Sequence, residues 1–224
     1  MTITYYGHSC FGVEVAGKHL LFDPFISHNP LAKDIKMDEI PCDFMLISHP
    51  HFDHFADAEP IAKRTNCTVI CLWETGNLLK ENGVTNVWQM NIGGKKDFGA
   101  FSVKCVAAVH SSGLAGAAAM GFVVSSEEGT FYFAGDTALT LDMQLIPMLC
   151  PPLGFAILPI GSNLTMDVAD AVVAADFIAC DTIIGCHYDT WQPIEIDHEA
   201  AIKAFEAEGK TLILPKVGGE LQWG

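Results

Sequence analysis

The sequence predicts an α/β fold in a single domain that spans residues 1–224. In both halves of the chain, apolar segments of strand length alternate with segments of helical character. Half of the residues are hydrophobic and only 17% are charged, which indicates a large buried core rather than disorder. No linker-like stretch and no short-period repeat divides the chain, so we expect one continuous α/β domain.

Strands are predicted where apolar and β-branched residues lie between turn signals. The expected strands are 3–6, 11–15, 19–22, 44–47, 67–72, 87–90, 101–109, 122–125, 130–134, 155–159, 182–186 and 212–214. The expected helices are 57–64, 74–81, 142–149, 167–180 and 196–208. Asp57 and Asp197 are predicted to cap their helices. The polar run Gly-Gly-Lys-Lys-Asp-Phe-Gly at 93–99 is predicted to be a turn.

The segment 44–54 carries the densest group of chemically active side chains. Its first four residues are apolar and predict a buried strand, and His49, His51, Asp53 and His54 follow almost at once. In extended chain, side chains two residues apart leave on the same side, as those of His49 and His51 would. Asp53 and His54 are adjacent and can share a direction only if the chain turns. The spacing therefore predicts two ligand groups directed at two neighbouring metals.

The motif His49-x-His51-x-Asp53-His54 resembles the signature of the metallo-β-lactamase superfamily. The resemblance continues along nearly the whole chain, through Asp23 after a strand, His110 at a strand end, Asp136 in Gly-Asp-Thr, and His187. Shorter segments are similar to a group of short prokaryotic metal-dependent hydrolases: GHS at 7–9, DPF at 23–25, NP at 29–30, TM at 165–166 and HYDT at 187–190. That group is similar to ascorbate-6-phosphate lactonase and, more distantly, to a phospholipase D that acts on N-acyl phosphatidylethanolamine. The resemblance implies a four-layer αββα sandwich.

The resemblance also implies two divalent metal ions held by seven residues. One metal would be bound by His49, His51 and His110, the other by Asp53, His54 and His187, with Asp136 bridging both. Five imidazoles and two carboxylates suit zinc first, with manganese, iron or nickel as alternatives.

Further roles follow from the resemblance. Asp23 would be a carboxylate that orients a metal-bound histidine, although an Asp-Pro turn also explains it. Asp53 would help to orient the attacking hydroxide, and His8 or Tyr188 would polarise the substrate, although a polar loop histidine also explains position 8. His28 is an open case that would stand near the mouth of the site.

The predicted activity is metal-dependent hydrolysis of a small ester-like substrate, a lactone or phosphoester, by a metal-bridged hydroxide. The sequence contains neither a nucleophile elbow nor a Ser–His–Asp pattern, so covalent catalysis is not indicated. The alternatives are a phosphodiesterase or nuclease of the same fold, a flavodiiron-type redox protein, and a non-catalytic metal-binding module. A flavodiiron protein usually has a carboxylate where His51 stands, and a non-catalytic module should have lost ligands.

The net charge and the cysteine content indicate which partners and which cellular compartment to expect. The net charge of −15 repels phosphate backbones, so we expect a small-molecule substrate and no nucleic acid. Eight cysteines form no Cys-x-x-Cys pair and several lie in apolar runs, which predicts free thiols in the cytoplasm. The chain opens without a signal-peptide pattern, and the uncharged segment 143–166 contains four prolines, which argues against a membrane helix. The oligomeric state is left open.

Overall fold

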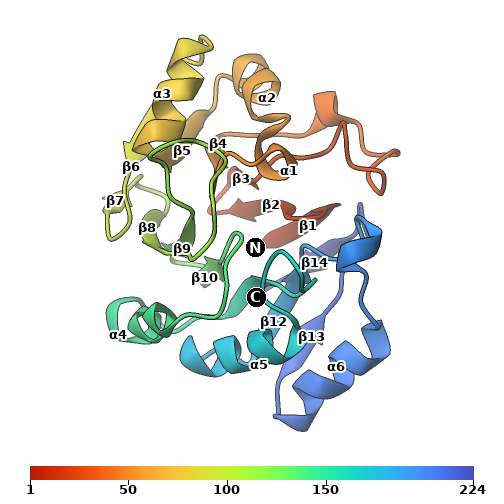
Figure 1. Cartoon of the computed structure of the whole chain (residues 1–224). Helices are drawn as coiled ribbons and strands as arrows, with labels where there is room; N and C mark the ends of the chain where they lie inside the picture. Colours follow the sequence, from red (N-terminus) through yellow and green to blue (C-terminus); the bar gives the residue numbers. More distant parts are fainter.

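The computed structural model describes all 224 residues and consists of two seven-stranded sheets packed face to face between two layers of helices (Figure 1). The strand order is β14-β1-β2-β3-β4-β5-β6 in the first sheet and β13-β12-β11-β10-β9-β8-β7 in the second. Helices α1–α3 lie over the first sheet and α4–α6 over the second (Figure 1). The predicted four-layer αββα sandwich is confirmed.

The first sheet is built from the N-terminal strands and the last strand of the chain. Its strands are β1 (Thr2–Gly7), β2 (Cys10–Val15), β3 (Lys18–Phe22), β4 (Phe44–Leu46), β5 (Thr68–Leu72), β6 (Val87–Met90) and β14 (Glu220–Gln222). The strands from β14 to β3 pair antiparallel, and those from β3 to β6 pair parallel. Because β3 to β6 run in one direction, their carboxyl ends meet at one edge of the sheet.

The second sheet repeats this arrangement. Its strands are β7 (Lys95–Asp97), β8 (Ser102–Ala107), β9 (Met120–Ser126), β10 (Gly129–Phe133), β11 (Phe155–Pro159), β12 (Thr182–Cys186) and β13 (Thr211–Ile213). The strands from β7 to β10 pair antiparallel, and those from β10 to β13 pair parallel. The loops after β8, β10, β11 and β12 therefore leave from the same edge.

The helices connect these strands. They are α1 (Phe52–Phe55), α2 (Ala58–Thr65), α3 (Trp73–Glu81), α4 (Ile146–Leu149), α5 (Val168–Phe177) and α6 (His198–Ala207). Three short 3₁₀ segments accompany them, at Met37–Glu39, Leu141–Leu145 and Gln192–Ile194. Asp197 caps α6 as predicted, since its carboxylate accepts a hydrogen bond from the Ala200 amide at 3.0 Å.

Three hydrophobic clusters hold the layers together. The largest lies between the sheets and takes aromatic side chains from both of them. Within it, the ring centroids of Phe22 and Phe133 are 4.8 Å apart, and those of Phe131 and Phe155 are 5.0 Å apart. Aromatic rings of this size bury large apolar areas and dominate core energetics. The two outer clusters lie under the helices of each side. Since the inner cluster is shared, the two sheets form one core.

Some sequence-based boundaries were wrong. The strand predicted over 101–109 ends at Ala107, so that His110 stands in a loop. The turn predicted at 93–99 contains β7, which pairs with β8, and β14 was not predicted at all. Asp57 does not cap α2. Its carboxylate instead accepts hydrogen bonds from the amides of Ile26 and Ser27, at 2.6 and 2.9 Å.

Two further predictions concern the cysteines and the uncharged segment 143–166. All eight cysteines are free thiols, and seven of them are buried. Residues 143–166 are divided between α4, β11 and the turns around them. None of the helices combines the length and the apolar character that a membrane span requires.

Candidate metal centre

The predicted ligands gather at the edge where the carboxyl ends of the parallel strands meet. His49 and His51 follow β4, and Asp53 and His54 lie on α1 directly after them. The second sheet supplies the remaining ligands from three loops: His110 after β8, Asp136 after β10 and His187 after β12. Both sheets therefore contribute to the cluster.

Backbone hydrogen bonds fix these loops against one another. The amide of Val109 donates to Thr137 Oγ1 at 3.0 Å, and the amide of Ala138 donates to the Val109 carbonyl at 3.0 Å. These two bonds hold His110 beside Asp136. Across the sandwich, the amide of His187 donates to the carbonyl of His8 at 2.9 Å. The two sheets are thus tied together at the site itself.

The first ligand group, His49, His51 and His110, lies towards the solvent side. The ligand atoms of the three imidazoles all lie within 4.8 Å of one another. His49 Nε2 is 2.9 Å from His51 Nδ1, so these two nitrogens converge as their spacing predicted. His49 is fully buried, whereas the His110 side chain is 14% exposed and His51 is also partly exposed. The group is open on one side.

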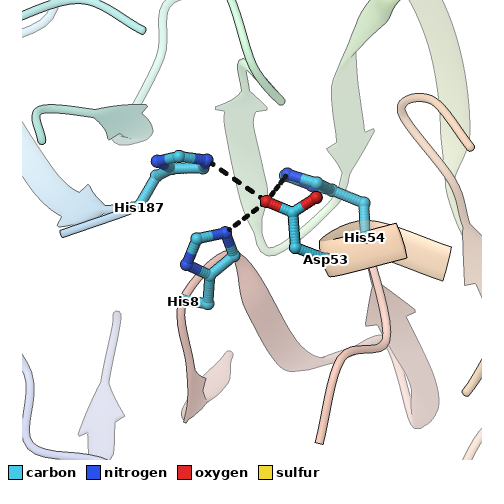
Figure 2. Close-up of side chains that lie close together, drawn as sticks. All are labelled: His8, Asp53, His54 and His187. Carbon is cyan, nitrogen blue, oxygen red and sulfur yellow. Dashed lines mark hydrogen bonds and ion pairs between the residues drawn. The ribbon is translucent and has the colours of Figure 1, made fainter. Parts of the chain in front are cut away.

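The second ligand group consists of His8, Asp53, His54 and His187 (Figure 2). The three imidazoles have no exposed surface. Asp53 Oδ2 lies in their midst, 3.0 Å from His8 Nε2 and 3.7 Å from the Nε2 atoms of both His54 and His187. His8 belongs to this group geometrically, although the sequence predicted only a substrate contact for it.

Asp136 lies between the two groups. Its Oδ2 is 3.2 Å from His54 Nε2 and 3.1 Å from His187 Nε2, both in the second group. The same atom is 3.5 Å from His110 Nε2 and 4.0 Å from His49 Nε2, both in the first group. One carboxylate oxygen therefore faces four imidazoles from both groups, which is the position that a bridging ligand needs.

A buried shell of hydrogen bonds orients the imidazoles. Asp23, which has no exposed surface, places Oδ2 2.8 Å from His54 Nδ1 and accepts a hydrogen bond from the Ser48 amide at 2.7 Å. Ser48 Oγ also lies 2.9 Å from His49 Nδ1. Thr190 Oγ1 lies 2.8 Å from His8 Nδ1. Such contacts fix ring orientation and leave the other ring nitrogen directed at the centre of the site.

Backbone conformation at the site is strained. His8, Asp23 and His187 have φ values of +56°, +40° and +55°, a left-handed region that side chains with a Cβ rarely adopt. Strained residues persist where the surrounding structure over-determines them, and they concentrate at functional sites. The backbone of Gly161 lies close to that of His187. A Cβ built at Gly161 would lie 2.0 Å from the His187 carbonyl oxygen, so only glycine fits there.

The two groups differ in electrostatics. Burial lowers the pKa of His49 and of His110 in the first group. In the second group, burial alone would lower the pKa of His187, but the carboxylates of Asp136 and Asp53 outweigh it and raise the pKa to about 9. Asp136 likewise raises the pKa of His54, against the effect of burial.

The two carboxylates and His8 complete this pattern. Burial would raise the pKa of Asp136, but the positive charges of His54 and His187 hold it well below its usual range. The pKa of Asp53 is also lowered, because the neighbouring imidazoles of His187 and His8 outweigh the effect of burial. Burial and the neighbouring His187 lower the pKa of His8 to about 4.

The donor set fits divalent metal ions. His54 Nε2, His187 Nε2 and Asp136 Oδ1 are buried and have no hydrogen-bond partner in the protein. Buried polar atoms are almost always satisfied, so atoms left unpaired around one point indicate a bound ion. Imidazole nitrogens and carboxylate oxygens are the ligands that zinc and related metals take.

Two of the predicted substrate contacts need revision. Tyr188 is buried in the outer cluster with its ring beside His198 of α6, at a centroid distance of 5.5 Å, and this position does not support contact with substrate. His8 is fully buried and bonded at both ring nitrogens, so it positions Asp53 rather than reaching a substrate. His28 stands beside exposed Phe52, near the site mouth as suggested. Sequence reasoning missed Ser48 and Thr190, although Thr190 lies within the segment 187–190 that carries the resemblance and Ser48 directly precedes the motif at 49–54.

The fold and this cluster define the chain as a metal-dependent hydrolase of the β-lactamase superfamily. The β-lactamase superfamily domain matches residues 2–187. The chain belongs, more narrowly, to the UPF0173 metal-dependent hydrolases of that superfamily, as its relatives show.

These relatives match along most or all of their length. A UPF0173 metal-dependent hydrolase of Flavobacterium johnsoniae is 46% identical over 226 residues, covering 99% of this chain and 100% of the relative. A relative of the same description from the archaeon Methanopyrus kandleri is 42% identical over 216 residues, covering 93% of both chains. Among solved structures, the metallo hydrolase Igni18 of Ignicoccus hospitalis is 29% identical, with a TM-score of 0.91 over 100% of this chain and 99% of that one.

Proposed function

We propose that the protein hydrolyses a small ester-like substrate, a lactone or phosphoester, with two divalent metal ions held by the two ligand groups. The observation that carries this proposal is the position of Asp136 Oδ2, within 4.0 Å of imidazoles from both groups. Zinc is the first metal to test, followed by manganese, iron and nickel. The narrower resemblance to ascorbate-6-phosphate lactonase stays a prediction.

The protein's own residues would have distinct tasks. His49, His51 and His110 would hold one ion, and Asp53, His54 and His187 the other. Asp136 would contact both ions and fix their separation. Asp23 would orient His54, and His8 would hold the Asp53 carboxylate in place at 3.0 Å. When bound, two such ions supply Lewis acidity and lower the pKa of a coordinated water to about 7.

Metal content and activity test the proposal together. Protein expressed in medium supplemented with each candidate metal should contain close to two ions per chain by elemental analysis. The loaded protein should then be screened against lactones, phosphodiesters and β-lactams. His198→Ala is a matched control, because His198 is an exposed histidine on α6 that pairs with Asp189 and not with the cluster. A content that stays at or below one ion per chain contradicts the two-metal arrangement.

We also propose a small-molecule substrate rather than a nucleic acid. The net charge of −15 opposes a polyanion that must be held along many phosphates. Turnover of a confirmed substrate should therefore be unchanged by excess structured RNA at low salt. Strong inhibition that disappears as salt is raised would contradict this part of the proposal.

A further inference from the structure

An aromatic strip extends from the second ligand group to the surface. It begins at His8, whose ring centroid lies 5.0 Å from that of Trp191 and 5.6 Å from that of Phe25. The buried Phe25 is 5.9 Å from Trp191 and 5.8 Å from Phe52. His28 closes the outer end, 5.1 Å from Phe52. Four separate segments supply these rings, namely helix α1 and the loops after β1, β3 and β12, so the sandwich assembles the strip only when folded.

Two rings of the aromatic strip, those of Phe52 and Trp191, are exposed to solvent. Phe52 is 61% exposed although it stands between the predicted ligands His51 and Asp53, and Trp191 is 37% exposed beside His8. An exposed aromatic ring forgoes much of the free energy that burial would give it. Exposed apolar side chains grouped at the rim of a polar site mark a surface that a ligand covers.

Basic side chains are missing from the segments that directly follow the strands at the ligand edge. These segments contain no lysine and no arginine: 23–30, 49–57, 110–119, 135–141, 160–167 and 187–195. The loop after β3 carries Lys33 and Lys36 only beyond the first of these segments. The cluster carboxylates Asp23, Asp53 and Asp136 pair only with histidines. Proteins that recognise phosphate groups rely on arginine forks and lysine charges, so these loops are poorly equipped for a phosphorylated substrate.

We infer that the substrate is an uncharged carboxylic ester or lactone whose apolar group lies against Phe52 and Trp191. This inference rests on the proposed hydrolytic function. It makes a carbonyl carbon, rather than a phosphorus atom, the centre that is hydrolysed. Hydrolysis joins the oxygen of one water to the acyl carbon and breaks the acyl carbon–oxygen bond. The departing alkoxide takes up a proton, leaving a carboxylic acid and an alcohol. Phe52 and Trp191 determine specificity by binding the apolar group and take no part in proton transfer.

A matched substrate series tests the inference in the metal-loaded protein. 4-Nitrophenyl acetate, butyrate and hexanoate share one leaving group, as does bis(4-nitrophenyl) phosphate. The value of kcat/KM should rise by about two- to fourfold per methylene along the ester series, since each methylene buried against the strip lowers the free energy. Relative to its own uncatalysed hydrolysis, the phosphodiester should be accelerated at least about 100-fold less than hexanoate, a difference of the size that specific contacts give.

Three variants test whether Phe52 and Trp191 cause the chain-length dependence of kcat/KM. Phe52→Ala and Trp191→Ala should each flatten the chain-length dependence while circular dichroism and metal content stay unchanged. Trp88→Ala is the control, because Trp88 is a 43% exposed aromatic residue that packs with Phe98 and Lys96 away from the cluster. It should keep the full chain-length dependence. Preferred turnover of the phosphodiester, or an unchanged dependence in both site variants, would overturn the inference while leaving the hydrolytic function intact.

A binding measurement separates failure of the inference from failure of the function. Tryptophan fluorescence is titrated with acetate, hexanoate and inorganic phosphate, and Trp191→Phe identifies the signal of Trp191. Hexanoate should bind more tightly than acetate, and phosphate should not perturb Trp191. If no ester or phosphodiester is hydrolysed by protein that contains two metals, the proposed function fails, and this titration still decides whether the strip binds apolar groups. Equal affinity for acetate and hexanoate would overturn the inference.

Discussion

The two ligand groups use the same chemistry in opposite surroundings. The first group, His49, His51 and His110, is partly open to solvent, and its members rely on few outer contacts. The second group is more deeply buried, with only Asp53 partly exposed, Asp23 bonded to His54, Thr190 bonded to His8 and strained backbone at His8 and His187. The pKa is lowered at His49 and His110 in the first group, whereas in the second group it is raised at His54 and His187 and lowered at His8. The first group therefore has more access to solvent, whereas the imidazoles of the second group are held by more contacts.

Asp136→Ala should impair both ligand groups. Because Asp136 Oδ2 faces imidazoles of both, its removal should take hydrolysis to background and weaken both metal sites. The core strands do not depend on this side chain, so circular dichroism should report a folded protein. Asp142→Ala, an exposed acid in the next turn of chain, is the control. Wild-type activity in Asp136→Ala would reduce Asp136 to a turn residue.

Metal uptake should depend on pH only in the second group. The pKa of His187 is about 9, so its ring holds a proton at pH 7 that an incoming ion must displace. Affinity should rise by about tenfold per pH unit up to pH 9 for each proton released. The lowered pKa values of His49 and His110 leave these rings neutral above pH 7, and the first group should show no such rise.

Two variants isolate the groups for this measurement. His51→Ala leaves the second group intact, and His187→Ala leaves the first. Calorimetry in buffers of different ionisation enthalpy counts the protons released with each ion. Equal proton release by the two variants would remove the electrostatic distinction between the groups.

Asp23→Asn should weaken the second group more than the first, because Asp23 contacts His54 directly and reaches His49 only through Ser48. The amide cannot supply the charge that holds His54 Nδ1 at 2.8 Å, and loss of such a partner costs about 10- to 100-fold in metal affinity. Competition with a chromophoric chelator measures both affinities. Asp43→Asn, an exposed acid that accepts from the His19 amide, is the control. An equal loss in both groups would show that Asp23 supports the whole cluster.

Gly113→Ala should weaken only the first group, and by less. A Cβ there would lie 2.8 Å from His51 Cδ2, and Gly113 has a φ of +72°. The left-handed backbone costs about 1–2 kcal/mol for alanine. Gly99→Ala separates the two effects, since Gly99 has a φ of +88° but no atom within 4 Å of the added Cβ. Both variants should lose similar stability in urea unfolding, and only Gly113→Ala should also release the first ion more readily. If Gly99→Ala does the same, the contact with His51 is irrelevant.

The structure brings together the residues that the sequence predicted as ligands, and their binding of metal stays a prediction. His49 and His51 converge since side chains two residues apart share a side, and the resemblance located His110, Asp136 and His187 at loops after strands. Fold class followed from the alternation of strands and helices. These features need no knowledge of which segments meet in space.

What the sequence did not predict depends on long-range contacts or on backbone turns. Thr190 and His8 are 182 positions apart, and only the closed sandwich brings them within 2.8 Å. Tyr188 was expected near the substrate, but His187 has a φ of +55°, so the chain leaves the strand and the alternation of sides no longer applies. β14 has three residues and pairs with β1 at the other end of the chain, which leaves no local signal.

Each ligand group takes residues from both sheets, and bound ions would therefore act as cross-links. An ion between His54 and His187, or between His49 and His110, closes a long loop of the chain and joins the two halves of the sandwich at their open edge. Secreted proteins obtain such constraints from disulfides, whereas all eight thiols of this chain are free. An ion that binds only the folded chain adds about 2.7 kcal/mol of stability when its free concentration is 100 times the dissociation constant. The melting temperature of this hydrolase then becomes a gauge of the metal supply around it.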